Sequence, residues 1–512
     1  MTDVTASGSF VPASGWRRRF ITISVMMATI MQALDMTIAN VALPNMQGSL
    51  STTQDQIAWV ITSYIVTSAI MMPPTGFLAR RFGRKRLLVV AVTGFTVTSM
   101  LCGIADSLQE IVIYRILQGA FGAFLVPLAQ ALMLDNYPRA QHGQAMAIWG
   151  IGTMIGPILG PTLGGYLTEY YSWRWVFFVN LPFGLLALAG ILLFVSETTR
   201  DRERRFDWFG FTLLGLAVGG FQLMLDRGEL KDWFEALEII IEASVAGMAF
   251  YMFVAHSLTT SRKPFLDPHI FADRNFVAGI MQIFVFGALL LPALALLPTF
   301  LQSVMGYPVI TVGHVLAPRG AGAMVGMFLV GRLSHRVDVR VILIVSLLLI
   351  AVSAWEMTGF NAEVDMWAVL WTGVVQGIGL GAYYVALNVV TYTTLPEHFR
   401  TEAAGIFNLA RNVGASVSVS IVVALVTHYT QINHAELVGG VTPYSLMTQA
   451  PYLPEAWSLD SAAGLGALNA EITRQAATIA YLNDFKLMTI VALAAIPLVF
   501  LFRLPRTAQV DH

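Results

Sequence analysis

The stretch Phe20–Leu43 reads FITISVMMATIMQALDMTIANVAL, and its one charged residue is Asp35. An α-helix advances about 1.5 Å per residue, so this stretch is long enough to cross a hydrocarbon layer of roughly 30 Å. It follows a small, polar segment (1–16) and the basic triplet Arg17–Arg19. It is also too long for the apolar part of a secretory signal peptide. The stretch therefore predicts a retained first membrane span.

The remainder of the chain has the same apolar character. Of its 512 residues, 56% are hydrophobic and only 12% are charged, whereas about 25% of residues are charged in ordinary soluble domains. Spans of about 20 apolar residues could be built roughly fourteen times from this composition. The composition excludes an ordinary soluble globular protein and predicts an all-α integral membrane protein.

Hydropathy over a window of about 19 residues predicts fourteen spans in three groups. The first six are 20–43, 57–78, 87–105, 109–134, 143–168 and 174–195. A pair follows at 207–225 and 236–257. The last six are 274–303, 309–334, 339–359, 366–395, 401–428 and 485–503.

The basic residues are distributed unequally between the two sides of these spans. On the side of the N-terminus we place 22 of the 30 Lys and Arg residues, and on the other side five. Basic residues concentrate in cytoplasmic loops, so both termini are expected in the cytoplasm. The remaining three, Arg115, Arg319 and Arg411, fall within predicted spans. The formal net charge of −1 gives no general attraction to nucleic acid, and no nucleic-acid partner is expected.

The two groups of six spans resemble each other. Gln118-Gly119 corresponds to Gln376-Gly377, and Pro138 to Pro396, each at an offset of 258 residues. Parallel repeats of this kind build many secondary transporters, whose binding cavity lies between the halves near the middle of the membrane. A duplicated membrane protein without a transport role is the alternative.

The repeat predicts a domain organisation with two bundles and an insertion. Its parts are a cytoplasmic N-terminus (1–19), an N-terminal six-helix bundle (20–195), a linker with two inserted spans (196–273), a C-terminal six-helix bundle (274–503) that includes an outer loop (429–483), and a cytoplasmic tail (504–512).

Two buried charges stand out as candidates for proton coupling. Asp35 lies roughly 13 Å and Arg115 about 9 Å below the outer ends of their helices, by helical rise. Each alone would cost at least about 2.5–3.5 kcal/mol in mid-membrane, so we expect them to face each other or a water-filled cavity. Burial favours a neutral carboxyl and a nearby Arg favours the charged one. Movement of Arg115 relative to Asp35 could therefore switch proton binding, and a purely structural ion pair is the alternative.

Further polar residues within the spans are candidates to line a substrate cavity, because cavities for greasy compounds combine apolar walls with a few polar groups. They are Gln32, Asn40, Gln118, Gln376, Tyr383, Tyr384, Asn388, Asn408, Arg411 and Asn412. The alternative is a network of hydrogen bonds that holds the helices together.

The sequence gives little support to a metal site or to an enzyme active site. Cys102 is the only cysteine, and the nine histidines show no metal-ligand spacing. The chain has no HExxH, GxSxG or Walker motif, so an intramembrane enzyme would depend on a lone carboxylate. We expect no metal, no catalytic residues and no cofactor.

Five motifs resemble those of the fourteen-span drug:proton antiporters of the major facilitator superfamily. They are the first-helix motif Leu34–Pro44, the loop Gly76–Arg86 with Gly83 and Arg84, the fourth-helix motif Arg115–Gly119, the antiporter motif Gly156-Pro157-Ile158-Leu159-Gly160-Pro161-Thr162-Leu163-Gly164-Gly165, and Leu225–Phe234 between the inserted spans. The last resembles the EmrB branch of this family. One departure is Arg80, which stands where the loop motif usually has an acid, and this puts the family's usual charge relay in doubt.

The glycines and prolines of the antiporter motif are expected to allow close helix packing. Packing of this helix against the other half would seal a cavity, and the basic loop would hold the two halves together.

The resemblance implies a proton-coupled antiporter of the bacterial inner membrane, which exports hydrophobic drugs or toxic compounds by alternating access and is driven by the proton gradient without a cofactor. It also implies a periplasmic EmrA-like adaptor and a TolC-like outer-membrane channel as partners. An uptake carrier, or an exporter of one endogenous metabolite, is the alternative. Helical spacing of apolar residues from Leu465 to Leu482 predicts an amphipathic helix in the outer loop, which would face the adaptor or pack on the protein itself.

Overall fold

The computed structural model describes residues 15–138, 141–198, 206–260, 266–334, 336–441, 457 and 461–503, and every element within them is a helix. The tail segments 1–14 and 504–512 lie outside the described residues. In the N-terminal half the helices are α1 (Gly15–Ser49), α2 (Gln54–Ile57), α3 (Trp59–Met71), α4 (Thr75–Phe82), α5 (Arg84–Ile104), α6 (Leu108–Gly122), α7 (Leu125–Asn136), α8 (His142–Tyr170), α9 (Trp175–Phe178) and α10 (Asn180–Phe194).

The insertion contains α11 (Trp208–Arg227), the short 3-10 helices η2 (Glu229–Lys231) and η3 (Trp233–Glu235), and α12 (Leu237–Thr259), and is followed by the 3-10 helix η4 (Pro268–Ala272). In the C-terminal half the elements are α13 (Arg274–Thr299), the π-helix η5 (Phe300–Val304), α14 (Val309–Leu333), α15 (Val339–Met357), α16 (Met366–Tyr392), the 3-10 helix η6 (Glu397–Phe399), α17 (Arg400–Gly440) and α18 (Ala462–Val499).

A helix lies at each of the fourteen predicted span positions. Not every one of these helices is long and apolar enough to count as a membrane span. Within the described residues, 12 helices are long and apolar enough to cross a membrane, or 13 when a bent pair counts as one span. That pair, Asp55–Met71 and Thr75–Phe82, is bent by 61° because Pro73 and Pro74 interrupt the helix. Of the helices at the fourteen predicted positions, α14 is the one that does not meet these criteria, and it carries Pro318 and the buried Arg319.

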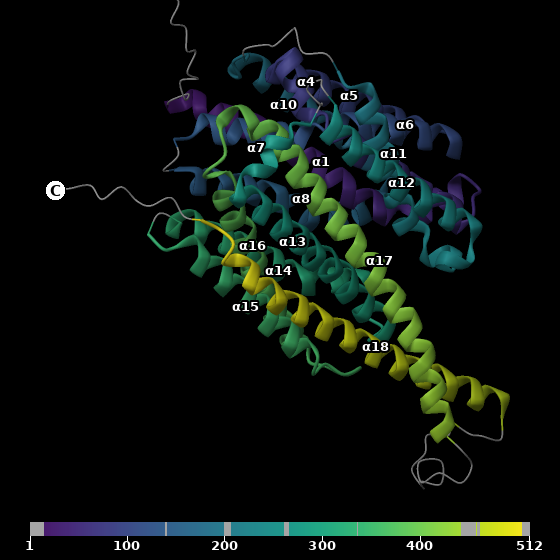
Figure 1. Ribbon diagram of the computed structural model, residues 1–512. Coiled ribbons are helices and arrows are strands. Elements are labelled where there is room, and N and C mark those ends of the chain that lie inside the picture. The colour runs from purple at the N-terminus through teal and green to yellow at the C-terminus, as the bar shows by residue number, and fades with distance from the viewer. Residues whose placement is uncertain are drawn as a thin grey trace, which may run out of the picture.

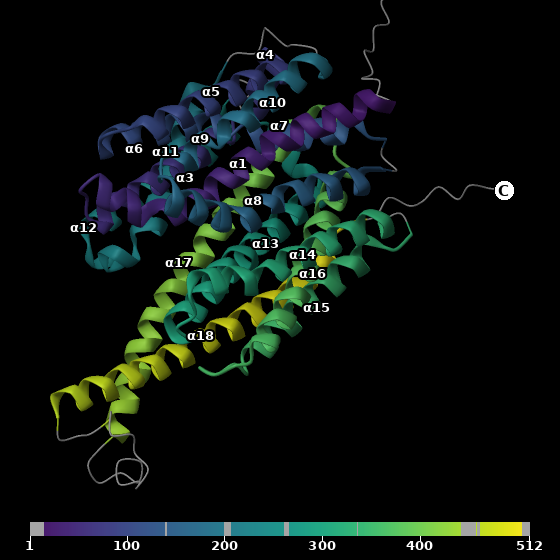
Figure 2. The ribbon, with the colours of Figure 1, turned by 180° about the vertical axis from the view of Figure 1, so that it is seen from behind.

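The two halves repeat one packing scheme, as the sequence offset predicts. In the first half α1 packs on α8 and α10, and α3 packs on α6. In the second half the equivalent α13 packs on α17 and α18, and α14 packs on α16. Figures 1 and 2 show the purple-to-blue first half beside the green-to-yellow second half. The predicted repeat of two equivalent helical halves is confirmed.

One end of the molecule, which we call the terminal face, is where α1 begins and α18 ends (Figure 1). The halves meet there through α8 against α14, and through α4 and α7 against α17. Residues 400–408 of α17 are buried, whereas residues 409–413 are half-buried. The halves are therefore closed against each other toward the terminal face and less tightly packed beyond it.

The inserted helices lie at the side of the bundle. The helix α11 packs against α3 and α17, whereas α12 packs mainly on α11. At the end of α11 the Asp226 carboxylate accepts a hydrogen bond from the Thr62 hydroxyl, and Arg227 pairs with Glu238. The segment Leu225–Phe234 therefore fastens the insertion to α3.

The predicted outer loop 429–483 is helical over most of its described length. The helix α17 continues to Gly440, and α18 already begins at Ala462, so a long hairpin extends from the far end of the bundle (Figures 1 and 2). The hairpin is held together by contacts such as the hydrogen bond from Asn433 Nδ2 to the Ala476 carbonyl (3.3 Å). Hydropathy underestimates these helices because they leave the apolar layer and become more polar.

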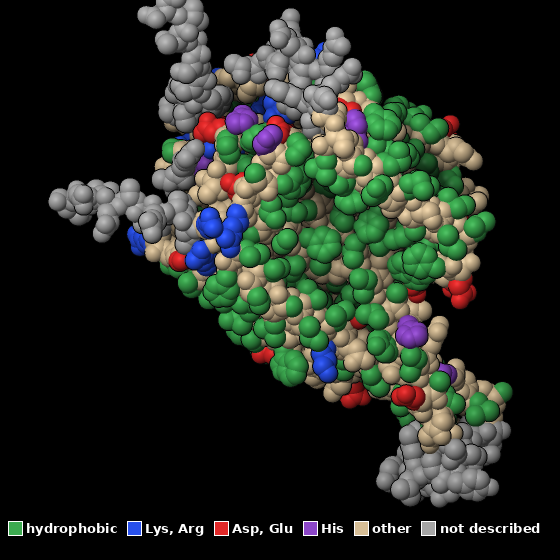
Figure 3. Space-filling view, in the orientation of Figure 1, with side chains coloured by type: hydrophobic (Ala, Val, Ile, Leu, Met, Phe, Trp, Pro, Cys, Tyr) green, Lys and Arg blue, Asp and Glu red, His purple; other side chains and the backbone are tan. Residues whose placement is uncertain are grey.

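The predicted amphipathic helix within this region is present as the first part of α18. Leu468, Ile472 and Ala476 are buried, whereas Leu465 and Ile479 are exposed. The helix thus packs partly on the protein itself and leaves an apolar edge. In Figure 3 hydrophobic side chains cover the broad middle of the molecule, as a lipid-facing surface requires.

Candidate functional site: a buried ion pair and the interface between the halves

Asp35 and Arg115 form an ion pair inside the N-terminal half. The Nη1 atom of Arg115 lies 2.6 Å from Oδ2 of Asp35, and the two side chains are 1% and 0% exposed. Arg115 also donates from Nε to the Val60 carbonyl of α3 (2.9 Å), and its guanidinium lies 4.3 Å from the centre of the Tyr64 ring. The similar depths inferred from sequence thus correspond to direct contact. In this conformation the pair is shielded from solvent.

Amide side chains complete the surroundings of the carboxylate. The other oxygen of Asp35, Oδ1, accepts hydrogen bonds from Gln118 Nε2 (2.8 Å) and Asn180 Nδ2 (2.9 Å). Asn180 also donates to the Ser99 hydroxyl (2.9 Å). Gln118, expected in the substrate cavity, instead belongs to this cluster because it bonds both charged groups. Asn180 and Ser99 were missed, since they lie on separate helices and in no motif.

Gln32 lies at the edge of the same cluster. Its Nε2 atom is 3.4 Å from the Tyr64 hydroxyl and 3.2 Å from the Met36 sulfur. Asn40, beyond Asp35 on α1, is exposed and takes no part in the cluster. Gln32 is therefore close to the ion pair through Tyr64, whereas Asn40 is not.

The antiporter motif packs against the helix that carries Asp35. A Cβ atom on Gly156 or Gly160 of α8 would overlap Ala33 or Thr37 of α1, and Thr37 donates a hydrogen bond to the Gly156 carbonyl (3.0 Å). These glycines pack on α1 in their own half, whereas the helix that carries them also packs against α14 of the other half, as expected. The motif's contact with the other half is made by Ile158.

Other residues of the motif have different surroundings. Gly164 packs on Ile38, whereas nothing lies within 4 Å of a Cβ on Gly165. Ile158 lies against Gly320 of α14. Pro157 is half-buried and Pro161 is exposed.

Gly156→Ala should therefore destabilise the protein, because the added methyl group forces α8 away from α1. Overpacking of this kind costs about 1–3 kcal/mol. The measurement is the melting temperature of the purified protein in detergent. Gly165→Ala is the matched control on the same helix and should leave the temperature unchanged or slightly higher. Equal melting temperatures for the two variants would contradict this assignment of the close contact.

The two halves meet on a polar contact between equivalent residues of the repeat. Gln130 of α7 donates a hydrogen bond to Asn388 of α16, 258 positions later in the chain. Asn408 of α17 donates to Gln130 Oε1 (2.9 Å). Because Gln130 and Asn388 are repeat equivalents, their contact lies near the axis that relates the halves. Asn388 and Asn408 are fully buried here, so they close the interface in this conformation.

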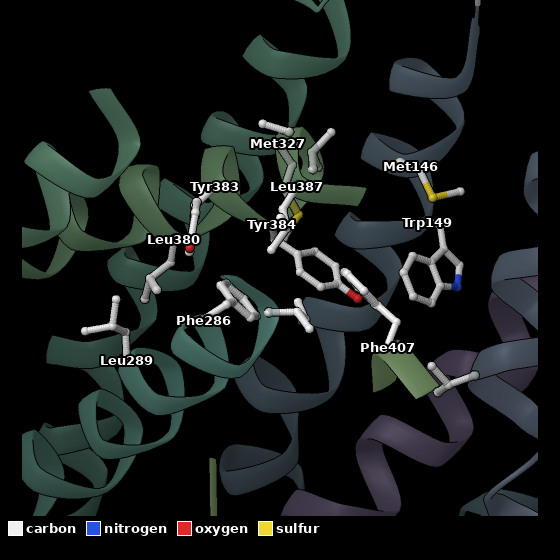
Figure 4. Packing of buried hydrophobic residues seen from close by; sticks show 14 of the residues in the cluster. Met146, Trp149, Phe286, Leu289, Met327, Leu380, Tyr383, Tyr384, Leu387 and Phe407 are labelled. Carbon is white, nitrogen blue, oxygen red and sulfur yellow. The ribbon is translucent and has the colours of Figure 1, made fainter. Parts of the chain in front are cut away.

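An aromatic stack lies beside this contact. Tyr384 of α16 is stacked between Trp149 of α8 (6.0 Å between centroids) and Phe286 of α13 (5.0 Å), as Figure 4 shows. Its hydroxyl accepts a hydrogen bond from Arg411 Nη1 (3.3 Å), and Nη2 of Arg411 lies 3.4 Å from Asn412 Oδ1. Arg411 and Asn412 are half-buried, which keeps them as candidates for contact with cargo.

Two further cavity candidates are buried away from this stack. Tyr383 donates hydrogen bonds to Gln282 of α13 and is fully buried. Gln376 is 1% exposed and lies next to Gly377, which packs on Arg319 of α14. Both residues therefore belong to the packing between α16 and its neighbours in this conformation.

The basic loop joins the halves at the terminal face. Gly76 lies directly on Glu402 of α17 with no room for a side chain. Glu402 forms an ion pair with Arg80, the residue that departs from the family pattern. An acid is thus present opposite Arg80, although on the other half of the protein.

A second charge network lies beside it. Arg84 pairs with Asp135 of α7, and Asp135 Oδ1 lies 2.9 Å from Arg400 Nη1 of α17. Gly83 adopts a positive φ of 93° between α4 and α5, which favours glycine, and it packs on Glu197. Asp135 and Glu197 were not singled out from the sequence.

Within the part of the chain that the structure describes, no group of three or more His, Cys, Asp or Glu residues could hold a metal. Cys102 is buried beside the ion-pair cluster, with its sulfur 3.6 Å from Gln118 Oε1.

Comparisons with known proteins agree with this architecture. Residues 25–419 match the family model of the Major Facilitator Superfamily. The multidrug export protein EmrB of Escherichia coli strain K12 is 35% identical over 447 residues, which are 86% of this chain and 86% of that protein. The fatty acid resistance protein FarB of Neisseria gonorrhoeae is 34% identical over 500 residues, which are 97% of this chain and 98% of FarB.

Solved structures show the same fold. The human organic anion transporter MFSD10 (TETRAN) matches with a TM-score of 0.58 at 13% identity, covering 94% of this chain and 100% of that chain. The repeated six-helix halves, the matched model and the relatives above 30% identity together show that this chain belongs to the Major Facilitator Superfamily, in the group of the multidrug export protein EmrB.

Proposed function

We propose that the protein is a proton-coupled antiporter that exports hydrophobic drugs or toxic compounds by alternating access. Its family makes it a membrane transporter rather than an enzyme. The relatives EmrB and FarB are named for multidrug export and fatty acid resistance, and both names fit lipophilic cargo. The proton gradient is the proposed energy source, and no cofactor is proposed.

The buried ion pair carries this proposal. Asp35 and Arg115 are covered by protein on all sides, so neither exchanges protons with water in this conformation. Arg115 is bonded to both α1 and α3, and a shift between these helices would separate the charges. A carboxylate that loses its guanidinium partner in an apolar interior binds a proton more readily. Helix movement and protonation are thereby linked.

The proposed location is the bacterial inner membrane, with both termini in the cytoplasm. The distribution of basic residues supports this orientation, and in Figure 3 a group of Lys and Arg side chains lies toward the terminal face. The interface closed at that face would then represent an outward-facing state. Lipid-exposed aromatic and aliphatic side chains on α10 and α12 fit a surrounding bilayer.

The proposed partners are a periplasmic EmrA-like adaptor and a TolC-like outer-membrane channel. The hairpin of α17 and α18 extends beyond the bundle at the far end, and Leu465 and Ile479 remain exposed on it. An apolar edge on a projecting helix is suited to binding a second protein, which supports the adaptor as the occupant.

Export is tested by accumulation of two probes, ethidium and radiolabelled decanoate, in energised cells that lack their own efflux pumps. Expression should lower the accumulation of at least one probe, and nigericin, which collapses the pH gradient, should remove the difference. Higher accumulation on expression would favour the uptake carrier, and a reduction that persists with nigericin would contradict proton coupling.

A further inference from the structure

The helix α18 carries a buried carboxyl group that the site above does not use. Three carboxylic side chains among the described residues belong to the buried class: Asp35, Glu402 and Asp484. Asp35 is paired with Arg115 and Glu402 with Arg80. Asp484 is 1% exposed, and its Oδ2 atom is buried without a hydrogen-bond partner. Its burial therefore lacks the compensation that the other two receive.

The surroundings of Asp484 are aromatic. In the sequence it lies between Tyr481 and Phe485, and both of these side chains pack against Phe300 of η5. The ring of Phe300 in η5 lies 5.6 Å from that of Tyr481 and 6.3 Å from that of Phe485. Phe360, in the connection between α15 and α16, belongs to the same aromatic cluster, with its ring 6.4 Å from that of Phe485. The carboxyl group is therefore enclosed near the far end of the C-terminal half.

No charge offsets this enclosure within the described residues. Among the described residues Asp484 forms no ion pair, and its Oδ2 atom has no hydrogen-bond partner. Tyr481, about one turn earlier on α18, is a neighbouring titratable group. Burial of an ionised carboxylate without a partner is costly, so a carboxyl group in such surroundings favours its neutral form.

The element that packs against the neighbouring Tyr481 and Phe485 is suited to movement. The segment η5 is a π-helix in which Met305 N bonds the Phe300 carbonyl (3.3 Å), and Pro298 lies just before it. Short π-helical segments within α-helices are frequent at functional sites, and proline removes one backbone hydrogen bond. Separation of η5 from α18 would give Asp484 access to water.

We propose that Asp484 is a second proton-binding site, located in the C-terminal half and separate from the Asp35 cluster. Asp484 takes a proton from water when α18 and η5 are apart, stays neutral while they are packed together, and returns the proton to water when they separate again. Protonation thus stabilises the packed arrangement of α18 and η5. This inference goes beyond the proposed export function and does not require Asp35 to be the coupling residue.

The test is modification of the full-length protein in proteoliposomes by dicyclohexylcarbodiimide, which reacts with protonated carboxyl groups in apolar surroundings. Peptides are quantified by mass spectrometry between pH 5.5 and 9. Asp484 should be labelled at low pH, and the labelling should fall at least tenfold toward high pH. The result should be the same in Asp35→Asn, so that failure of this proposal is distinguishable from failure of Asp35 coupling. Absent or pH-independent labelling of Asp484 would overturn the proposal.

Two variants complete the experiment. Asp484→Asn mimics the neutral side chain and should remove the decline in melting temperature that the parent shows as pH rises; an unchanged decline would also overturn the proposal. Asn483→Asp is the matched control, because residue 483 is exposed and a carboxylate introduced there is ionised in water. Labelling at position 483 of that variant equal to the labelling of Asp484 would show that burial is not the cause, and would overturn the proposal as well.

Discussion

Asp35→Asn is expected to reduce proton-coupled export of the transported probe to background. Among the described residues, the variant removes the only carboxylate within bonding distance of Arg115 and with it the proposed proton site. It also leaves a buried guanidinium uncompensated, and breaking a buried pair in this way costs about 3–5 kcal/mol. Loss of transport by this variant alone would therefore not show whether the cause is the missing proton site or a less stable protein.

The double variant Asp35→Asn with Arg115→Gln separates the two effects. It removes both charges, so the melting temperature should recover relative to Asp35→Asn. Export should remain at background, because neither charged group of the pair is left at the site. Arg115→Gln alone should also lose export, since Asp35 would then lack the partner whose movement is proposed to switch its proton binding.

The measurement is export of the probe in proteoliposomes together with proton release from the same vesicles. Gln32→Ala is a nearby control, because Gln32 contacts Tyr64 but neither charge. Proton-coupled export by the double variant at the level of the parent would reduce the ion pair to a structural role.

The second large effect is expected at the terminal face, where Glu402→Lys should open the contact between the halves. The substituted ammonium group would face Arg80 in place of the present ion pair, and the hydrogen bond that Asp267 N donates to Glu402 Oε1 (2.6 Å) would be lost. Glu402 is 1% exposed whereas Arg80 is 22% exposed, so solvent reduces the repulsion only in part. A change of about 1.4 kcal/mol would shift the equilibrium ratio of closed to open molecules tenfold.

Opening is measured with a cysteine at Ala404, which is buried close to the contact region. Its reaction with a membrane-permeant maleimide should become at least roughly tenfold faster in Glu402→Lys. The native Cys102 is buried and gives a low background. The charge exchange Arg80→Glu with Glu402→Arg should restore slow labelling, and equally fast labelling in the exchanged protein would show that the pair does not hold the halves together.

Much of the site could be predicted because transmembrane charges are rare. Asp35 and Arg115 each interrupt an apolar helix, and their depths follow from helical rise, so the sequence predicted that they face each other or a water-filled cavity. The structure decided between these two by showing the ion pair. Asn180 and Ser99 could not be found in this way, because neutral polar residues are common in spans. Their role comes from the fold, which places α5 and α10 beside α1.

The residues that pair across the interface between the halves could not be predicted from the sequence either. Arg80 departs from the family motif, and its acid partner Glu402 is 322 positions away. The repeat placed Gln130 and Asn388 in equivalent positions, but not in contact with each other. The glycines of α8 indicated close packing, yet the choice between α1 and the other half was open until the helices were placed.

The sequence by itself determined the apolar helices, the duplication and the position of Asp35 within its span, because hydropathy and helical rise depend only on residues close in the chain. Tertiary structure decided which helices meet, how far α17 and α18 extend, and that Asp35 is paired whereas Asp484 is not. These outcomes depend on contacts between residues that are distant in sequence, and only the packing of the two halves brings them together.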